Sequence, residues 1–498
     1  MKLCLSLDLA ALACGVVASI SFGAFMNIVA PFPRGISRIP RIGRGVAATV
    51  LQNFYDVVAA GGFSLHSQFA KQSGFRAAGY HFSFMKRIFI FHPIDIEHMI
   101  VRNGENYVKG DAYVALRDLL GNGLVTIVDG ETHARHRRLV SPAFSPAALS
   151  AIANTTMREH TMALYECVRK NCRDDVAGVF TTRARSLIHR VALNIIAEAA
   201  FHLQRGELEN VADAIALLLR QEVTILRIIR MLPVVGRWLP VQWLSKTHWQ
   251  LRKVTRLVNE ITRRIKNESP STPGNGQAII DYLISSKELS DNDIRDHSLT
   301  FMFAGFDTSS NTLQWALALL IRHADVQDRL FEELCDAVSQ GACPAIEELR
   351  KCKFLDCVIR ETLRLCPTVA MFQRRAVRDD VIPFSKVVIP SGSVVVFSIQ
   401  ACHRSPDIYG ADADEFRPER WEDPHLVERC GLSGFCPFSL GVRNCIGKDF
   451  AWNEVSFMLA VIIRNFKVCG DGAPFPRGST NIVCAPEDFS ITFLQRQL

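Results

Sequence analysis

A loop with two glycines and one cysteine, followed at once by a helix, constrains this chain more than any other segment. Residues 446–466 have a helical pattern, so the cysteine sulfur lies at the positive end of a helix. Backbone N–H groups stabilise a thiolate in that position. A single cysteine in such a turn is more often a buried structural thiol, and other segments must decide between the two. The spaced residues of the loop are Phe438, Gly441, Arg443, Cys445 and Gly447.

A second segment lies inside a long predicted helix. Ser290 suits its N-cap, and the helical pattern continues to about His323. At 1.5 Å per residue such a helix is about 50 Å long, enough to cross a domain. Near its middle stand residues 304–308, Ala-Gly-Phe-Asp-Thr. Gly305 costs about 1 kcal/mol within a helix and therefore indicates a close approach by another group. A helix glycine beside a solvated aspartate explains this segment equally well when it is taken alone.

A third pattern combines two segments that follow. Glu361 and Arg364 stand one helical turn apart in a predicted helix over residues 354–365. Such a pair is usually a surface ion pair worth about 0.3 kcal/mol. Residues 416–421, Phe-Arg-Pro-Glu-Arg-Trp, come later and include Arg420. Neither segment is informative without the other.

In this order, the segments resemble the motifs of the cytochrome P450 family. The haem-binding loop of that family reads Phe-x-x-Gly-x-Arg-x-Cys-x-Gly, and every fixed position is present between residues 438 and 447. Residues 304–308 are similar to its oxygen-activation motif. The Glu-x-x-Arg pair and the Pro-x-Arg segment also have their counterparts here. The resemblance covers essentially the full chain and is to the microsomal type, fungal members included.

The resemblance implies a mainly α-helical fold with a small β-rich subregion. Haem b would lie between the long central helix and the cysteine loop, with the Cys445 thiolate as axial ligand of the iron. Period-two runs predict strands at residues 87–91 and 387–397. Apolar residues at three-to-four spacing predict helices over residues 187–201, 207–227 and 246–266.

The resemblance also implies roles for single residues. Thr308 would hold bound dioxygen by a hydrogen bond, and Asp307 would help to deliver protons. Glu361, Arg364 and Arg420 would lock together behind the haem loop and serve folding and haem retention. The residues expected to bind the cofactor are Cys445, Arg443, Arg137, His133, Arg375, Phe438, Gly447, Ala304 and Gly305.

His133 marks a departure from the family pattern. It stands where the family commonly has the tryptophan of Trp-x-x-x-Arg, although many fungal members also have histidine there. The spacing to Arg137 is kept, so both side chains can reach a haem propionate from neighbouring turns. A plain surface histidine is the alternative. Arg374 and Arg375 are further propionate candidates, of which Arg375 is preferred.

Residues 1–30 are expected to form an N-terminal membrane anchor. The stretch from Leu9 to Met26 is apolar or small, and a spanning helix needs about 20 such residues. A cleaved secretory signal has the same features. The arginines that follow outnumber Lys2, which favours an anchor with the rest of the chain in the cytosol. The expected arrangement is a single-pass protein of the endoplasmic reticulum, with a Pro/Arg connector over residues 31–45 and the catalytic domain over residues 46–498.

Charge and cysteine usage exclude some classes of protein. The net charge of +7 is spread over 498 residues, which argues against nucleic-acid binding and suits weak docking to an acidic partner or membrane. The 15 cysteines are scattered without a Cys-x-x-Cys pair. Most are therefore expected to be small buried apolar residues in a reducing compartment.

The activity implied is that of a haem-thiolate monooxygenase. It would insert one oxygen atom from O2 into a hydrophobic small molecule, a secondary metabolite such as a terpenoid. No segment resembles a flavin or nicotinamide domain, so electrons would come from NADPH-cytochrome P450 reductase, with cytochrome b5 as a further donor, docked near Arg135, Arg138 and Lys448. A haem-thiolate isomerase or dehydratase is the alternative enzyme, disfavoured by the intact Asp307-Thr308 pair. A non-catalytic haem-binding protein would have no use for that pair.

Overall fold

The computed structural model describes residues 37–38, 70–71, 73–82, 85–203, 246–268, 278–338, 343–478 and 483–496. The expected anchor, all of the connector but residues 37–38, and the predicted helix over residues 207–227 lie outside the described residues. Among the helices of the described ranges, none combines the length and the apolar character that a membrane span requires.

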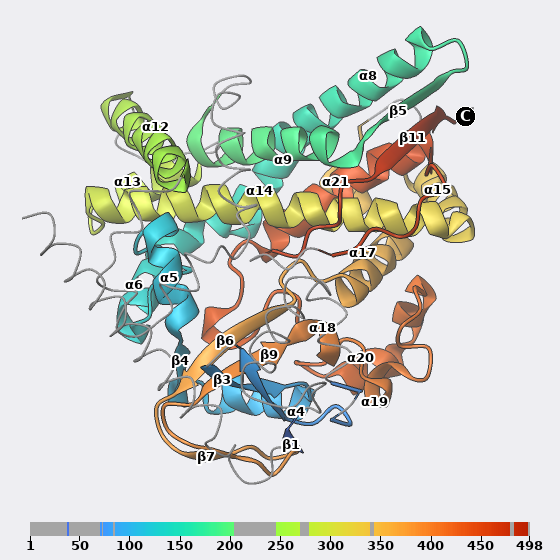
Figure 1. The fold of residues 1–498 in the computed structure, drawn as a ribbon. Coiled ribbons are helices and arrows are strands. Elements are labelled where there is room, and N and C mark those ends of the chain that lie inside the picture. The colour runs from blue at the N-terminus through green and yellow to red at the C-terminus, as the bar shows by residue number, and fades with distance from the viewer. Residues whose placement is uncertain are drawn as a thin grey trace, which may run out of the picture.

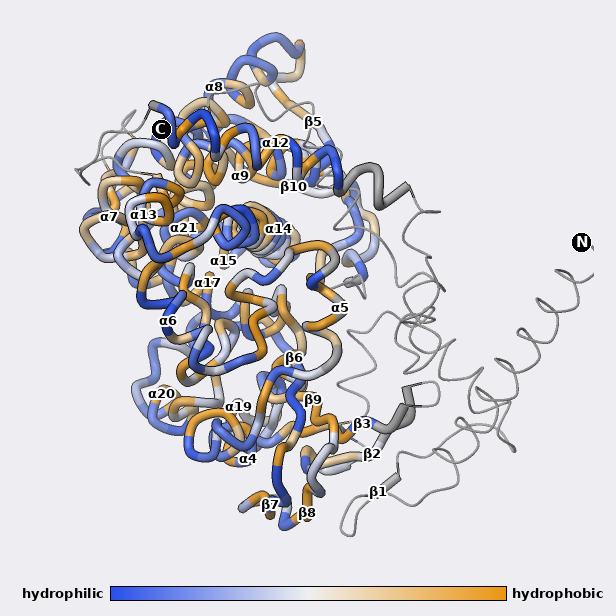
Figure 2. The backbone as a smooth tube through the Cα atoms, turned by 90° about the vertical axis from the view of Figure 1, so that its left-hand side faces the viewer, coloured by the Kyte–Doolittle hydropathy of each residue, from blue (hydrophilic) through white to orange (hydrophobic). Residues whose placement is uncertain are grey.

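Helices dominate the described chain, and α14 (Asp291–Arg322) runs through its centre (Figure 1). Seen nearly end-on in Figure 2, α14 is surrounded by other helices, while β3, β6 and β9 lie at the end of the molecule opposite α8 and α9. The other helices are α4 (Pro93–Glu97), α5 (Asp111–Leu120), α6 (Gly130–Val140), α7 (Pro146–Ile152), α8 (Arg158–Asp174), α9 (Ala184–Phe201), α12 (Lys246–Glu268), α13 (Ile279–Ser285), α15 (Ala324–Ala337), α16 (Ile346–Leu349), α17 (Lys353–Leu365), α18 (Ile399–Cys402), α19 (Pro406–Tyr409), α20 (Pro424–Cys430) and α21 (Lys448–Asn465).

The strands form small sheets in a mainly helical fold, and the largest sheet makes up the small β-rich subregion that the sequence predicted. The largest sheet has the order β1-β2-β3-β9-β6-β4, a second has the order β10-β11-β5, and β7 pairs with β8. Their bounds are β1 (Ser37–Arg38), β2 (Ala78–Phe82), β3 (Met85–Ile90), β4 (Tyr107–Lys109), β5 (Val179–Arg183), β6 (Met371–Ala376), β7 (Asp380–Val381), β8 (Val388–Ile389), β9 (Val394–Ser398), β10 (Phe466–Cys469) and β11 (Ser490–Gln495).

The central helix begins where its capping residue predicts. The Ser290 hydroxyl accepts a hydrogen bond from the Asp293 N–H at 3.2 Å, and the Asp293 carboxylate accepts one from the Ser290 N–H at 3.0 Å. This reciprocal pair satisfies backbone donors that the first turn leaves open. The predicted strands at residues 87–91 and 387–397 correspond to β3 and to β8 with β9, and the predicted helices over residues 187–201 and 246–266 to α9 and α12.

Candidate active site

The cysteine loop is closed by a hydrogen bond of its own backbone. The Cys445 N–H donates to the Phe438 carbonyl at 2.8 Å, and the ring of Phe438 packs near that of Trp452, with centroids 6.2 Å apart. Gly441 has a φ of 64°, and a Cβ there would lie 2.8 Å from the carbonyl oxygen of Ile100. Only glycine fits that position, because the left-handed backbone and the close carbonyl both exclude a side chain.

Gly447 has a different relation to its surroundings. A Cβ at this position would lie 4.0 Å from the Cys445 sulfur, an ordinary contact distance. The protein itself therefore leaves room for a side chain beside the sulfur. A glycine here is consistent with space kept for a group that binds the sulfur.

Cys445 differs from nearly all other cysteines in the described ranges. Apart from Cys167 on α8, it is the only one that is exposed. Burial raises the pKa of its thiol, whereas the Gly447 N–H and the charge of Arg137 lower that pKa. Cys445 is thus exposed although protein surrounds its thiol, as a residue that binds a group would be.

The buried middle of α14 has one accessible stretch. Between Asp296 and Leu320 every residue is buried apart from Ala304, Gly305 and Thr308, the three that share one helical face. α14 packs against α21, the helix that follows the cysteine loop. The accessible stretch of α14 therefore lies on a helix that contacts α21, and Cys445 lies in the loop that leads into α21.

The structure separates the two residues that were expected to act together. The accessible Thr308 donates its hydroxyl proton to the Ala304 carbonyl at 2.7 Å, which leaves the hydroxyl oxygen able to accept a further hydrogen bond. Asp307 is buried, and its carboxylate accepts a hydrogen bond from the Asn311 amide at 3.0 Å. Only Thr308 belongs to the accessible stretch.

Gly305 is explained by helix packing. A Cβ there would lie 2.7 Å from Cδ1 of Ile196 on α9. The close approach indicated by a glycine in mid-helix is therefore that of α9. This contact gives no support to a role of Gly305 at the cofactor.

Arg137 and Arg443 tie the cysteine loop to α6 and to the segment before it. Arg137 donates to the main-chain and side-chain oxygens of Asn444, both at 2.6 Å. Arg443 donates to the carbonyls of Ile127 at 2.9 Å and Val128 at 3.0 Å. Burial and the charge of nearby Arg374 lower the pKa of Arg443 to about 10, which still leaves it positive at neutral pH.

His133 is buried, so the alternative of a surface histidine is wrong. Burial, followed by the charges of Arg443, Lys109, Arg137 and Arg374, lowers its pKa to about 3. The imidazole is therefore neutral at physiological pH and has one N–H to donate. Its place on α6, one turn before Arg137, agrees with the spacing in the sequence.

Among the basic residues near His133, the sequence did not predict Lys109 and favoured Arg375 over Arg374. Arg374 is buried, and its positive charge lowers the pKa of Lys109, His133 and Arg443. The preferred Arg375 is not among the main causes of these shifts. Successive side chains on a strand point to opposite faces, so Arg374 and Arg375 on β6 cannot serve the same site equally. Lys109, at the end of β4, belongs to no recognised motif, and only the strand pairing reveals it. The role of Arg375 stays a prediction.

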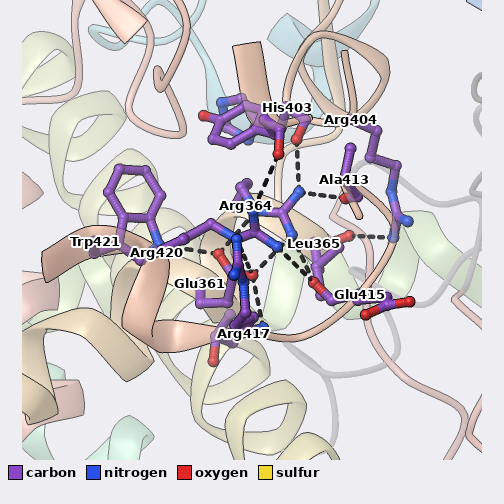
Figure 3. Close-up of polar contacts among 12 residues, drawn as sticks. Glu361, Arg364, Leu365, His403, Arg404, Ala413, Glu415, Arg417, Arg420 and Trp421 are labelled. Carbon is purple, nitrogen blue, oxygen red and sulfur yellow. Dashed lines mark hydrogen bonds and ion pairs between the residues drawn. The ribbon is translucent and has the colours of Figure 1, made fainter. Parts of the chain in front are cut away.

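The carboxylate of Glu361 is the centre of a buried network (Figure 3). It accepts two hydrogen bonds from the Arg364 guanidinium, both at 2.8 Å, and one from Arg420 at 2.8 Å. The Trp421 indole N–H adds a fourth at 2.9 Å and the Arg417 N–H a fifth at 2.9 Å. The expected association of Glu361, Arg364 and Arg420 is confirmed. Arg364 also donates to the carbonyls of His403, Ala413 and Glu415.

Comparison with known proteins decides the family. The sequence profile of the family described as Cytochrome P450 matches residues 54–493. The chain belongs to the cytochrome P450 family. It is 28% identical over 438 residues to cytochrome P450 monooxygenase 91 of Postia placenta, which covers 77% of this chain and 79% of the relative. Cytochrome P450 4d8 of Drosophila melanogaster is 28% identical over 429 residues, 78% of this chain and 89% of the relative. Cytochrome P450 4V2 of Homo sapiens is 30% identical over 393 residues, 74% and 72% of the two chains.

As a P450, this protein is an oxidoreductase that uses haem b with an axial cysteine thiolate. The residues present fit that group. An exposed cysteine stands in a loop with room at Gly447, and the charges that act on Lys109 and His133 are all cations. Such a cluster suits the two carboxylates that haem b carries.

Proposed function

We propose that this P450 is a haem-thiolate monooxygenase with Cys445 as the ligand of the iron. It inserts one oxygen atom from O2 into a hydrophobic small molecule, a secondary metabolite such as a terpenoid. The observation that carries the proposal is the exposed Cys445 in the loop before α21, together with the accessible stretch of α14, the helix against which α21 packs. The substrate class rests on the sequence alone, on the fungal-like His133 and the apolar N-terminus.

Each side chain of the site has a definite task in this function. When bound, haem supplies the reductive activation of dioxygen, which thiolate ligation promotes by donating electron density. The Gly447 N–H and the charge of Arg137 stabilise the negative sulfur of Cys445. Arg443 and Arg374 neutralise the haem carboxylates, and the neutral His133 donates a hydrogen bond to them.

Thr308 and Asp307 have separate tasks in proton delivery. The accessible Thr308 hydroxyl accepts a hydrogen bond from the group that delivers the proton, because its own hydrogen is donated to the Ala304 carbonyl. Asp307 lies behind this face, and its hydrogen bond with Asn311 holds it in place. It supplies protons from the interior side of α14.

Electrons come from NADPH-cytochrome P450 reductase, with cytochrome b5 as a further donor. Arg135 and Arg138 on α6 and Lys448 on α21 are exposed. The Arg137 contact with Asn444 holds α6 against the cysteine loop, so these three cations lie on neighbouring elements. Residues 1–30 anchor the protein in the endoplasmic reticulum membrane, with the catalytic domain in the cytosol. Reversal of the three charges should slow reduction by the reductase, and an unchanged rate would exclude this docking surface.

Carbon monoxide binding to the reduced protein tests the ligand. The Soret band should move to the long wavelength that thiolate ligation produces, and Cys445→Ala should abolish that band. Cys167→Ala is the matched control, because Cys167 is the other exposed cysteine of the described ranges. A Cys445→Ala protein that keeps the band would refute the proposal. Consumption of reductant and oxygen by the wild type then separates a monooxygenase from an isomerase, a dehydratase or a haem carrier.

A further inference from the structure

Two buried cations face each other across a pair of strands. Lys109 on β4 is the direct partner of Arg374 on the antiparallel strand β6. Their side chains are only 9% and 5% exposed. Like charges directly opposite in a ladder destabilise it, and buried lysines and arginines are rare unless an opposite charge accompanies them. The pair therefore requires an explanation.

The contacts of Lys109 with the protein are all with neutral groups. Its ammonium group donates to the carbonyls of Leu124 and Val125, both at 2.8 Å. The ring of Tyr113 lies 5.3 Å from Nζ of Lys109 and 5.6 Å from Cζ of Arg374, and the Tyr113 hydroxyl accepts a hydrogen bond from Arg374 at 3.2 Å. These groups orient the two basic side chains and supply no negative charge to either.

The charged groups around Lys109 have the same sign as its own. Burial and the charges of Arg443, Arg374, Arg117 and Arg137 lower the pKa of Lys109 to about 6. These residues lie on β6, α5, α6 and the cysteine loop, and the acidic Glu105, exposed in the 3-10 turn Gly104–Asn106 before β4, is not among the causes of the shift. His133 of α6 also faces the cluster and is neutral. The acidic Asp129 acts on Arg443 and does not figure among the charges that shift Lys109.

This cluster is continuous with the cysteine loop. Arg443 lies two residues before Cys445, and Arg137 holds Asn444, the residue directly before the sulfur. A ligand whose anionic end entered the cluster would therefore lie beside the loop that carries Cys445. Haem b, the cofactor of this family, carries two carboxylates and is such a ligand.

We propose that Lys109 is a further ligand of the haem carboxylates and that it takes up a proton when haem binds. A carboxylate beside Lys109 favours its charged form, whereas the surrounding cations and burial favour the neutral form when haem is absent. Lys109 thus takes up a proton when haem binds, while Cys445, whose thiol pKa is raised by burial, gives up its own proton as it becomes the thiolate ligand. Between about pH 6 and the higher pKa that Lys109 has in the loaded protein, the Lys109 proton lowers haem affinity as pH rises, by up to about tenfold per pH unit, and so offsets the gain in affinity that loss of the Cys445 proton gives.

Transfer of haem to a competing protein measures this linkage. The ferric holoenzyme is mixed with excess apomyoglobin from about pH 6.5 to about pH 9, and the absorption spectra give the share of haem that each protein holds. Lys109→Arg keeps a charge at every pH, so its share of haem should rise with pH relative to that of the wild type. Lys109→Met should hold less haem than the wild type at the acidic end, and its pH dependence should parallel that of Lys109→Arg. Cys445 is unchanged in all three proteins, so the differences between them report on Lys109, whereas the carbon monoxide spectrum tests Cys445 ligation.

Either of two results would overturn the proposal. If the share of haem held by Lys109→Arg varies with pH in parallel with that of the wild type, the linked proton is bound elsewhere. A Lys109→Met protein that retains haem as well as the wild type at every pH would show that Lys109 is no ligand. If both variants fail to fold, a proton measurement on the wild type alone tests the proposal. Loss of haem returns a proton to Cys445 and frees one from Lys109, so in weak buffer with a pH indicator the wild type should take up much less than one proton per haem lost, after correction for the acceptor. Uptake of a full proton would also refute the proposal.

Discussion

Arg137 holds Asn444 by two hydrogen bonds of 2.6 Å, one to its main-chain oxygen and one to its side-chain oxygen. Asn444 directly precedes Cys445, so this contact joins α6 to the cysteine loop next to the sulfur. The fork of the guanidinium matches the two oxygens, and a lysine cannot reproduce that geometry.

Removal of this fork should loosen the loop. Arg137→Ala is expected to lose about 1–3 kcal/mol of unfolding free energy, because two charged hydrogen bonds disappear. It should also release haem faster to apomyoglobin. Arg138→Ala, at the next position on α6, is exposed and serves as the control. Equal thermal unfolding of the two variants would contradict the role given to Arg137.

Glu361→Gln should prevent most of the chain from reaching a stable holoprotein. The substitution leaves two buried arginines without their shared carboxylate, and breaking a buried ion pair costs about 3–5 kcal/mol. The yield of carbon monoxide-binding protein relative to total protein measures the loss. Glu419→Gln is the matched control, because Glu419 pairs with Arg329 at 3.2 Å on the surface, where a pair is worth about 0–1 kcal/mol.

Gly305→Ala tests whether α9 explains the glycine. The added methyl would lie 2.7 Å from Cδ1 of Ile196, and overpacking of this kind costs about 1–3 kcal/mol, partly offset by the better helix propensity of alanine. Ile196→Val removes that δ-carbon. The double variant should therefore be more stable in urea than the sum of the two single substitutions predicts. Additive effects would mean that the glycine serves another purpose.

Thr308→Ala should uncouple reductant consumption from product formation. Haem binding and the carbon monoxide spectrum should stay as in the wild type, while product per NADPH falls by about tenfold or more, since the hydroxyl at the accessible face is lost. Ser309→Ala is the control, because the Ser309 hydroxyl is buried and donates to the Gly305 carbonyl at 2.9 Å. Hydrogen peroxide and product are measured together. Normal coupling in Thr308→Ala would remove Thr308 from the mechanism.

Glu454 on α21 should make stability depend on pH. Burial raises the pKa of this carboxyl from 4.5 to about 8, and nearby Ser309 only partly opposes the shift. Between these values the folded protein keeps a proton that the unfolded chain loses, so stability falls as pH rises from about 4.5 to about 8, by at most about 1.4 kcal/mol per pH unit. Glu454→Gln should remove this slope in urea unfolding, whereas the exposed Glu428→Gln should keep it. A slope unchanged in Glu454→Gln would show that the proton is bound elsewhere.

Some of the site could be predicted because its residues are neighbours in the chain. The spacing from Phe438 to Gly447 defines the loop, Ser290 begins the central helix, and Glu361 and Arg364 stand one turn apart. Motif resemblance then joined Arg420 to that pair, as the network confirms. These relations depend on local backbone geometry, which residue types and their spacing determine.

The sequence by itself determined the family, the cysteine loop and the central helix, because each is written in residues a few positions apart. Only the tertiary structure decided that Lys109 faces Arg374, that Ile196 occupies the space beside Gly305, and that Asp307 is buried. The reason is that strand register and helix packing join residues from distant parts of the chain, and no local pattern states which of them will meet.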